Sequence, residues 1–461
     1  MAPEAERQRH EGTLQAVPRD DMPARELVAY PVVGHLLAFH RNPIGLLESC
    51  AATPGDVIEL RIRGRTYLLK RPEDIRHVLS DHSAYAKSPR TIGSRATRLS
   101  GDGVLTSTDE AHRPLRRRVQ PVFRWKFVAG LTEVVVRGVD AMLNRWDHAV
   151  EIDLGNEMTR LARRNLISSI FGVESGPEFT ALEDGVIARR RSLNRVRESL
   201  VTLPAFLPIA LRPGRRRAIR RLDNTVDELI HVRRYQAVPS DDLLSMLIDT
   251  HEGGRSASDR RHVADEALTL ALAGFETVAR ALTWAFVALS RNPGVEAELR
   301  AEIDCVLGDR MPRAADCTSL RYAEMTVAES MRLWPPNALI VRVARQDDIV
   351  PTGARIRAGS KLFLSPYIVQ RDPAYFPDPG RFEPERFSEE ERRGRLKYAY
   401  FPFGGGPRGC IGQSLATLEC TLVLARTVQR ARLDLLGEPP RYTDRSLPSG
   451  KGPRMRVTAR A

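Results

Sequence analysis

A glycine-rich stretch, residues 403–412, holds the side chain best suited to binding a metal. Cys410 lies there among five glycines, whose backbone freedom allows a tight loop. Thiolate is the metal-binding form of cysteine, and neighbouring positive charge, here that of Arg408, favours it. An apolar run, residues 411–424, follows, and a sulfur before a helix start can accept free N–H groups. The stretch predicts a cysteine ligand. A structural cysteine and a phosphate-binding loop are the alternatives, and the latter lacks its Gly-Lys-Ser/Thr ending.

A second candidate site lies in a long apolar segment, residues 258–290. The pattern predicts one helix of about 33 residues, near 50 Å long. Ser258 is the expected N-cap, and Asn292-Pro293 ends the run. The segment is apolar around most of its circumference after Ala267, so we expect it to cross the core.

The middle of this segment, Ala273-Gly274-Phe275-Glu276-Thr277, contains three locally unfavourable choices. A glycine within a helix costs about 1 kcal/mol relative to alanine, and a buried acid is costly unless partnered. Thr277 can bond to a carbonyl one turn earlier and distort the helix. Together these choices predict a functional site. A kinked core helix with a satisfied acid is the alternative.

Charged residues at helical spacing occur in two further places. His112 and Arg116 lie four residues apart and share one helix face, where two cations suit a pair of anions. A solvated basic helix start is the alternative. Glu329 and Arg332 lie three apart in the predicted helix 322–333 and can pair on its face.

The elements that must position these residues follow from periodicity and turn residues. Residues 84–108 have no clear period and predict a functional loop, because structureless loops of this length are uncommon in compact domains. Helical periodicity predicts helices at 43–52, 72–80, 131–170 and 178–234, whereas alternation predicts strands at 56–61, 66–70, 339–344 and 361–364. The apolar stretch 200–211 is interrupted by two prolines and is too short to span a bilayer.

These motifs resemble those of the cytochrome P-450 superfamily of heme-thiolate monooxygenases. Residues 403–412 match its heme-binding signature, and 273–277 match the pattern of its oxygen-activating helix. Glu329 and Arg332, followed by Arg386 in Pro384-Glu385-Arg386-Phe387, match its structural triad. The motifs occur in the family's order over nearly the whole chain. The resemblance implies a mainly α fold with small β-sheets (α+β), in which a long central helix crosses a buried heme.

The resemblance also implies roles for individual residues. Cys410 would be the metal ligand of heme b (iron protoporphyrin IX), with Phe403 beside the sulfur and Gly412 in the same cofactor-binding loop. Glu276 and Thr277 would be catalytic, holding waters that deliver protons during dioxygen activation. The triad would hold the cysteine loop against the core. The expected ligands of the heme propionates are His112, Arg116, Arg342 and Arg408. One departure is Gln370, which stands where the family frequently has histidine.

The expected substrate is small and apolar, of the terpenoid, polyketide or fatty acyl type found in secondary metabolism. Dioxygen would be the second substrate. Only residues 411–461 follow the ligand, too few for a fused flavin or iron–sulfur domain, so electrons should come from a ferredoxin and an NAD(P)H-linked ferredoxin reductase. The residues expected to line the substrate pocket are Leu203, Phe206, Ala273, Ala338 and Leu339.

Composition limits the remaining possibilities. No linker divides the 461 residues, so we expect a disordered segment at 1–25 and a single domain at 26–461. No transmembrane segment is expected. The five scattered cysteines indicate a reducing compartment, hence a cytoplasmic protein, which we expect to be a monomer.

The net charge of +13 comes almost entirely from arginine, in clusters such as 189–191 that are interspersed with acids and apolar helical residues. Solvated helix faces are the favoured reading. A basic patch could instead dock an acidic electron-transfer partner. A nucleic-acid-binding protein, which would contain no heme, and a heme-thiolate gas sensor without catalysis are the competing functions.

Overall fold

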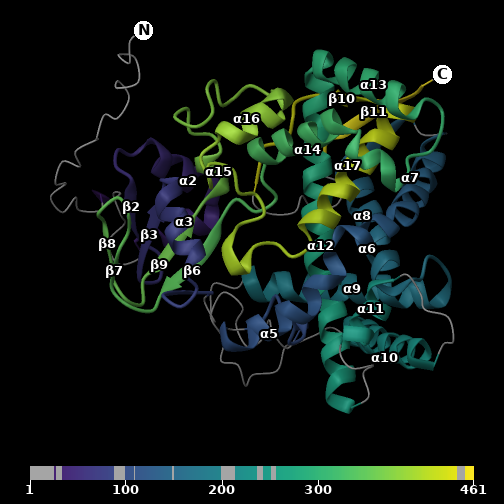
Figure 1. The fold of residues 1–461 in the computed structure, drawn as a ribbon, viewed down its shortest axis with the longest axis horizontal. Coiled ribbons are helices and arrows are strands. Elements are labelled where there is room, and N and C mark those ends of the chain that lie inside the picture. Colours follow the sequence, from purple (N-terminus) through teal and green to yellow (C-terminus); the bar gives the residue numbers. More distant parts are fainter. Residues whose placement is uncertain are drawn as a thin grey trace, which may run out of the picture.

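The computed structural model describes residues 25–26, 34–87, 99–107, 109–147, 150–198, 213–235, 242–250, 256–443 and 452–460. Its architecture is mainly helical with small sheets, which confirms the predicted fold class. Figure 1 shows the largest sheet on one side of the molecule and most helices on the other. Segment 200–211, with Leu203 and Phe206, lies outside the described residues, as do residues 1–24. Arg25 begins the short strand β1 (Arg25–Glu26).

The predicted long helix is α12 (Ala257–Arg291), 35 residues long. Its N-cap is Ser256 rather than Ser258, because the Ser256 hydroxyl accepts the N–H of Asp259 while the Asp259 carboxylate accepts the N–H of Ser256. This reciprocal arrangement satisfies two free donors of the first turn. Within the described residues, α12 is the one helix long and apolar enough to cross a membrane, but 67% of its most apolar window is buried inside the protein. It is therefore a core helix.

Helices α8 (Leu154–Phe171), α14 (Arg321–Leu333) and α17 (Gln413–Arg430) pack against α12 and share its hydrophobic core. Helices α9 (Gly176–Glu198), α10 (Pro213–Tyr235) and α11 (Leu243–Thr250) also contact α12, and they lie with it in the lower half of Figure 1. The remaining helices are α1 (Leu36–Arg41), α2 (Pro43–Ala52), α3 (Pro72–Ser80), α5 (Asp109–Val119), α6 (Trp125–Gly130), α7 (Thr132–Trp146), α13 (Pro293–Leu307), α15 (Pro366–Val369) and α16 (Glu389–Gly394). The short 3-10 helices are η1 (Gln120–Phe123), η3 (Ala314–Thr318), η4 (Pro384–Phe387) and η5 (Gly406–Arg408).

The largest sheet is buried on both faces. Successive side chains of a strand point to opposite faces. Tyr67 and Leu69 therefore join one apolar cluster, which includes residues of α3, and Leu68 joins another, which includes residues of α2. Among the described residues the strand order is β1-β2-β3-β9-β6-β4. The strands are β2 (Val57–Arg61), β3 (Arg65–Leu69), β4 (Tyr85–Ala86), β6 (Ile340–Ala344) and β9 (Lys361–Leu364).

A second sheet corrects one prediction. The run 131–170, expected to be helical throughout, contains strand β5 (Glu151–Asp153) between α7 and α8. Strand β11 (Arg454–Ala459) pairs antiparallel with both β5 and β10 (Ala431–Leu436). A strand this short carries too few residues to show alternation, and its partner lies far along the chain. Strands β7 (Asp348–Ile349) and β8 (Arg355–Ile356) form a small separate hairpin.

Candidate active site

The cysteine loop is held by its own backbone and by α3. The N–H of Cys410 donates to the Phe403 carbonyl at 2.9 Å, and that of Gly404 donates to the Phe401 carbonyl at 2.9 Å. Gly406 has φ +63°, and a Cβ there would lie 1.8 Å from the carbonyl oxygen of Leu79 at the end of α3. Only glycine fits this position. The loop is thus constrained rather than flexible.

Cys410 lies in a crevice that reaches solvent. The surrounding protein removes water, which raises the pKa of the thiol, while the N–H of Gly412 and the charge of Arg116 lower it. Arg116 donates to the Gly409 carbonyl at 2.7 Å. Arg408, expected to supply the charge beside the sulfur, donates instead to the Ser107 carbonyl at 2.8 Å. The cation that favours the thiolate is therefore Arg116, from α5.

The four residues expected to bind propionates converge around Arg408. Burial, followed by the charge of Arg408, lowers the pKa of Arg342 to about 10. Burial, followed by Arg408 and Arg116, lowers the pKa of His112 to about 3. With only cations around it, His112 is thus neutral near pH 7, and its expected role at the propionates stays a prediction.

This donor set fits a heme. In the described part of the chain, no carboxylate pairs with Arg116 or Arg342. Buried cations are costly unless an anion accompanies them. A ligand that offers a metal to the Cys410 sulfur and carboxylates to these arginines would satisfy both requirements. Phe403 is half-buried and packs against the main core, as does Ile411.

The predicted site on α12 has an incompletely packed face. Ala273, Glu276 and Thr277 are half-buried, although the neighbouring Phe275 and Val278 are buried. The Thr277 hydroxyl donates to the Gly274 carbonyl at 2.8 Å. The backbone remains α-helical throughout α12.

Gly274 has a packing explanation. A Cβ there would lie 2.7 Å from Cδ2 of Leu166 on α8, closer than side chains normally approach. The glycine therefore allows α8 and α12 to pack closely. Close packing against this flexible neighbour is thus one reason for a glycine here.

Glu276 forms an ion pair with Arg190 of α9. The two side chains are 12% and 19% exposed, so the pair is partly shielded from solvent.

Arg190 belongs to the cluster 189–191 that was expected to be a solvated helix face, and this interpretation is wrong for two of the three residues. Arg189 is buried and pairs with Asp223 of α10. A signal existed in the sequence, because Arg189 follows the buried Val186 at helical spacing.

The functional loop expected at residues 84–108 is attached to α12 where it is described. Its Val104 N–H donates to Glu266 at 2.8 Å, and the Thr269 hydroxyl donates to the Ser100 carbonyl at 2.8 Å. Burial raises the pKa of Glu266 to about 7. Sequence reasoning missed these contacts, because Glu266 and Thr269 lie in an apolar helix without a recognisable motif.

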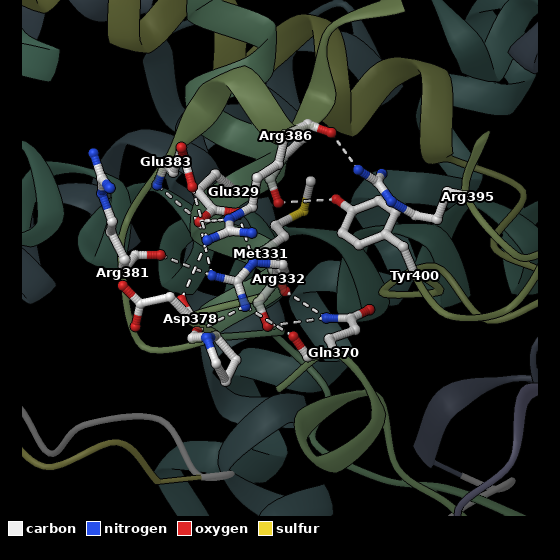
Figure 2. A network of polar contacts seen from close by, with 12 residues as sticks. Glu329, Met331, Arg332, Gln370, Asp378, Arg381, Glu383, Arg386, Arg395 and Tyr400 are labelled. Carbon is white, nitrogen blue, oxygen red and sulfur yellow. Dashed lines mark hydrogen bonds and ion pairs between the residues drawn. The ribbon is translucent and has the colours of Figure 1, made fainter. Parts of the chain in front are cut away.

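The predicted triad forms a buried network (Figure 2). Arg332 donates to Glu329 through Nε at 2.6 Å and through Nη2 at 2.8 Å, and both side chains are fully buried. Nε of Arg386 lies 3.7 Å from Glu329, whereas its Nη2 lies 2.8 Å from Glu383. Arg386 is therefore held more closely by Glu383, which the sequence analysis did not single out.

The described residues of the expected substrate pocket lie on different elements. Ala273 is on α12. Ala338 is buried in the apolar cluster on the α2 side of the large sheet, and Leu339 packs against the same cluster.

Comparison with known proteins identifies the protein family. The chain matches the cytochrome P450 family model over residues 24–452, and it belongs to that family. It is a cytochrome P450 monooxygenase, and the family implies a heme-thiolate cofactor.

The relatives are bacterial. The chain is 36% identical to cyclooctatin synthase of Streptomyces melanosporofaciens, over 87% of this chain and 88% of that protein. It is 32% identical to pentalenene oxygenase of Streptomyces avermitilis, over 88% of this chain and 90% of the relative. The heme domain of cytochrome P450DA has the same fold, with a TM-score of 0.78 at 24% identity, covering 96% of this chain and 99% of that one.

Proposed function

We propose that this monooxygenase inserts one atom of O2 into a small apolar substrate of terpenoid type, with Cys410 as the proximal ligand of heme b. The observation that carries the proposal is the constrained Cys410 loop beside one buried arginine, Arg342, and two half-buried ones, Arg116 and Arg408. When bound through a cysteine thiolate, heme supplies an iron whose electron density favours O–O cleavage. Arg116, Arg342 and Arg408 would hold its propionates, with neutral His112 as a further hydrogen-bond donor. Phe403 would pack beside the sulfur, and the N–H of Gly412 would stabilise the thiolate.

Glu276 and Thr277 are proposed to move protons. The Thr277 hydroxyl donates its hydrogen to the Gly274 carbonyl. Its oxygen is therefore available to accept a hydrogen bond from a water. The pairing with Arg190 favours the ionised form of Glu276. This carboxylate must accept a proton and pass it inward, which requires the ion pair to loosen during turnover.

The terpenoid class rests on the relatives' names. One is a cyclooctat-9-en-7-ol 5-monooxygenase at 32% identity, and another is a pentalenene oxygenase. Polyketide and fatty acyl compounds are the alternatives. A screen of cyclic terpenes, macrolides and fatty acids by the change in heme spin state would separate these classes. Product analysis of the compounds that bind would complete the test.

A ferredoxin is the proposed electron donor. Beside Cys410 lies a cavity of about 450 Å³ whose lining includes Arg116, Arg124 and Trp125. Trp125 and Phe127 are 47% and 37% exposed. Cationic and aromatic side chains together suit an acidic partner. Arg124→Glu should weaken ferredoxin-supported turnover, whereas the equivalent change at exposed Arg456 on β11 should not.

Substitution of the proposed ligand tests the function directly. Cys410→Ser should abolish the red-shifted Soret band of the reduced carbon monoxide complex, because that band requires a thiolate. Cys305→Ser is the control, since Cys305 is exposed and distant in the sequence. A Cys410→Ser protein that retains the band would refute the ligand assignment. The sensor alternative predicts the band without NAD(P)H-linked product formation in the presence of ferredoxin and reductase.

The cellular setting is also a proposal. We propose a cytoplasmic monomer with a single domain at 26–461. All five cysteines are free thiols, and the apolar helix α12 is mostly buried. Both observations support the cytoplasmic setting. Sedimentation of the purified heme-loaded protein would test the monomeric state.

A further inference from the structure

We propose that Gln370 is a positioning residue that ties the cysteine loop to the Glu329–Arg332 network and so keeps Cys410 placed as a thiolate ligand. The inference rests on the proposed role of Cys410. Gln370 is the residue at which the chain departs from the family's frequent histidine. It is fully buried and follows α15.

The side-chain amide of Gln370 makes three hydrogen bonds, and Figure 2 shows the two that its nitrogen donates. Its nitrogen donates to the carbonyls of Met331 at 3.0 Å and Arg332 at 3.1 Å. Its oxygen accepts the backbone N–H of Phe401 at 2.9 Å. The backbone carbonyl of Gln370 also accepts from Nη1 of Arg332 at 2.9 Å. One residue thus connects α14 to the start of the cysteine loop.

Two of these bonds satisfy backbone carbonyls at the end of α14. The last four carbonyls of a helix lack intrahelical partners, and α14 ends at Leu333, shortly before Pro335-Pro336, which bring no N–H groups. Gln370 supplies donors to two of these carbonyls. An amide offers two N–H donors and one acceptor. Neutral histidine offers one of each, and leucine offers none.

The connection continues to Cys410 through short bonds. The carbonyl of Phe401 accepts the N–H of Gly404 at 2.9 Å, and that of Phe403 accepts the N–H of Cys410 at 2.9 Å. Tyr400 provides a parallel link, since its hydroxyl donates to the Ala328 carbonyl of α14 at 3.0 Å. Of these two links from α14, Gln370 is the one that binds the backbone entering the loop, while Arg116 of α5 holds the Gly409 carbonyl. Loss of the Gln370 link should therefore let the loop move while α14 remains folded.

The test compares Gln370→Leu and Gln370→His with a matched control, Gln429→Leu. The Gln429 amide also makes three such bonds, donating to the Gly308 and Arg310 carbonyls and accepting from Arg426. It lies at the far end of α17 from Cys410. The readouts are the fraction of the dithionite-reduced carbon monoxide complex with the red-shifted Soret band, and the rate of heme transfer to an apoprotein acceptor.

The three variants should differ in the size of their effect. Gln370→Leu should shift most of the complex to the shorter-wavelength band and release heme about tenfold faster, because it leaves the Phe401 N–H unpaired and one such buried group costs about a factor of ten. Gln370→His should lie between it and the wild type. Gln429→Leu should match the wild type in both readouts.

Three outcomes would contradict the role of Gln370 or the ligand assignment of Cys410. If both Gln370 variants keep the wild-type band fraction and heme release, Gln370 has no positioning role. If Gln370→Leu does not fold, Gln370→His carries the test, and a wild-type spectrum in that variant would refute the proposal. If the wild type itself lacks the red-shifted band, the ligand assignment of Cys410 fails instead.

Discussion

The two sides of the proposed heme site are built in different ways. On the α14 side, Arg332 uses all five of its N–H donors, on Glu329 and on the carbonyls of Gln370, Pro379 and Arg381. On the α9–α12 side, Arg190 pairs with Glu276, and within the described residues its Nε has no hydrogen-bond partner.

The difference between the hydrogen bonds of Arg332 and Arg190 suits two different functions. An arginine bound to several backbone carbonyls cannot change partners without breaking the fold around it. Arg190 makes two hydrogen bonds, to Glu276 and to the Leu272 carbonyl, against five for Arg332, so less must break when its ion pair opens. The first arrangement suits retention of the cysteine loop. The second suits a carboxylate that must exchange protons and change neighbours.

Removal of Arg332 should have the largest effect. Arg332→Leu leaves the Glu329 carboxylate buried without its main partner, and breaking one side of a buried pair costs about 3–5 kcal/mol. We expect a strongly lowered thermal midpoint and little bound heme. Arg137→Leu is the control, because Arg137 pairs with Glu133 and Glu174 on the surface, where a pair contributes under about 1 kcal/mol. Equal losses in the two variants would contradict the contrast.

Glu276→Gln should affect turnover but not folding. The amide keeps the shape of the side chain and cannot relay a proton, and a positioned acid or base contributes about 10²–10⁴-fold. Product formation with ferredoxin and reductase should fall about 100-fold, with heme content and thermal midpoint near wild type. The solvent deuterium isotope effect should rise. A variant that loses heme instead would place Glu276 with the retention network.

Glu419 on α17 offers a pH test of a buried carboxyl without an arginine. Burial raises its pKa to about 8, and its partner is the amide of Asn165 at 3.1 Å. An unfolded glutamate has a pKa of about 4.3. The stabilisation from the neutral form is therefore complete below about pH 4 and is lost as the pH rises to about 8.

The thermal midpoint should accordingly fall between pH 5 and pH 8 by an amount equivalent to a few kcal/mol, roughly 1.4 kcal/mol per unit of pKa difference. Glu419→Gln should remove this part of the decline. Burial also raises the pKa of Glu329, but Arg332 and Arg386 oppose the rise, so this carboxyl should show the same behaviour more weakly. A pH profile identical in wild type and Glu419→Gln would show that Glu419 is not the titrating group.

Gly274→Ala should have the smallest effect. The added methyl would meet Cδ2 of Leu166 at 2.7 Å, but that atom ends a flexible side chain. A gain of about 1 kcal/mol in helix propensity opposes the crowding. We expect a midpoint within a few degrees of wild type and unchanged turnover. Gly406→Ala is the comparison, because its methyl would collide with the Leu79 backbone, and it should lose heme.

The sequence by itself determined the features that local patterns encode. The extents of α2, α3 and β9 match their predictions, because proline starts and alternating residues act over a few positions. Cys410, the Glu329–Arg332 pair and the long helix with Glu276 and Thr277 were found because motifs keep their residues close in sequence. The expected roles of these residues remain proposals.

Tertiary structure decided which distant groups meet. Arg190 as the partner of Glu276, Glu383 as the closer partner of Arg386 and the three bonds of Gln370 each join segments that no local pattern connects. The same holds for β5, whose pairing with β11 spans most of the chain. Such pairings depend on the shape of the whole core, because helix and strand periodicity specify which face is buried and not which neighbour it meets.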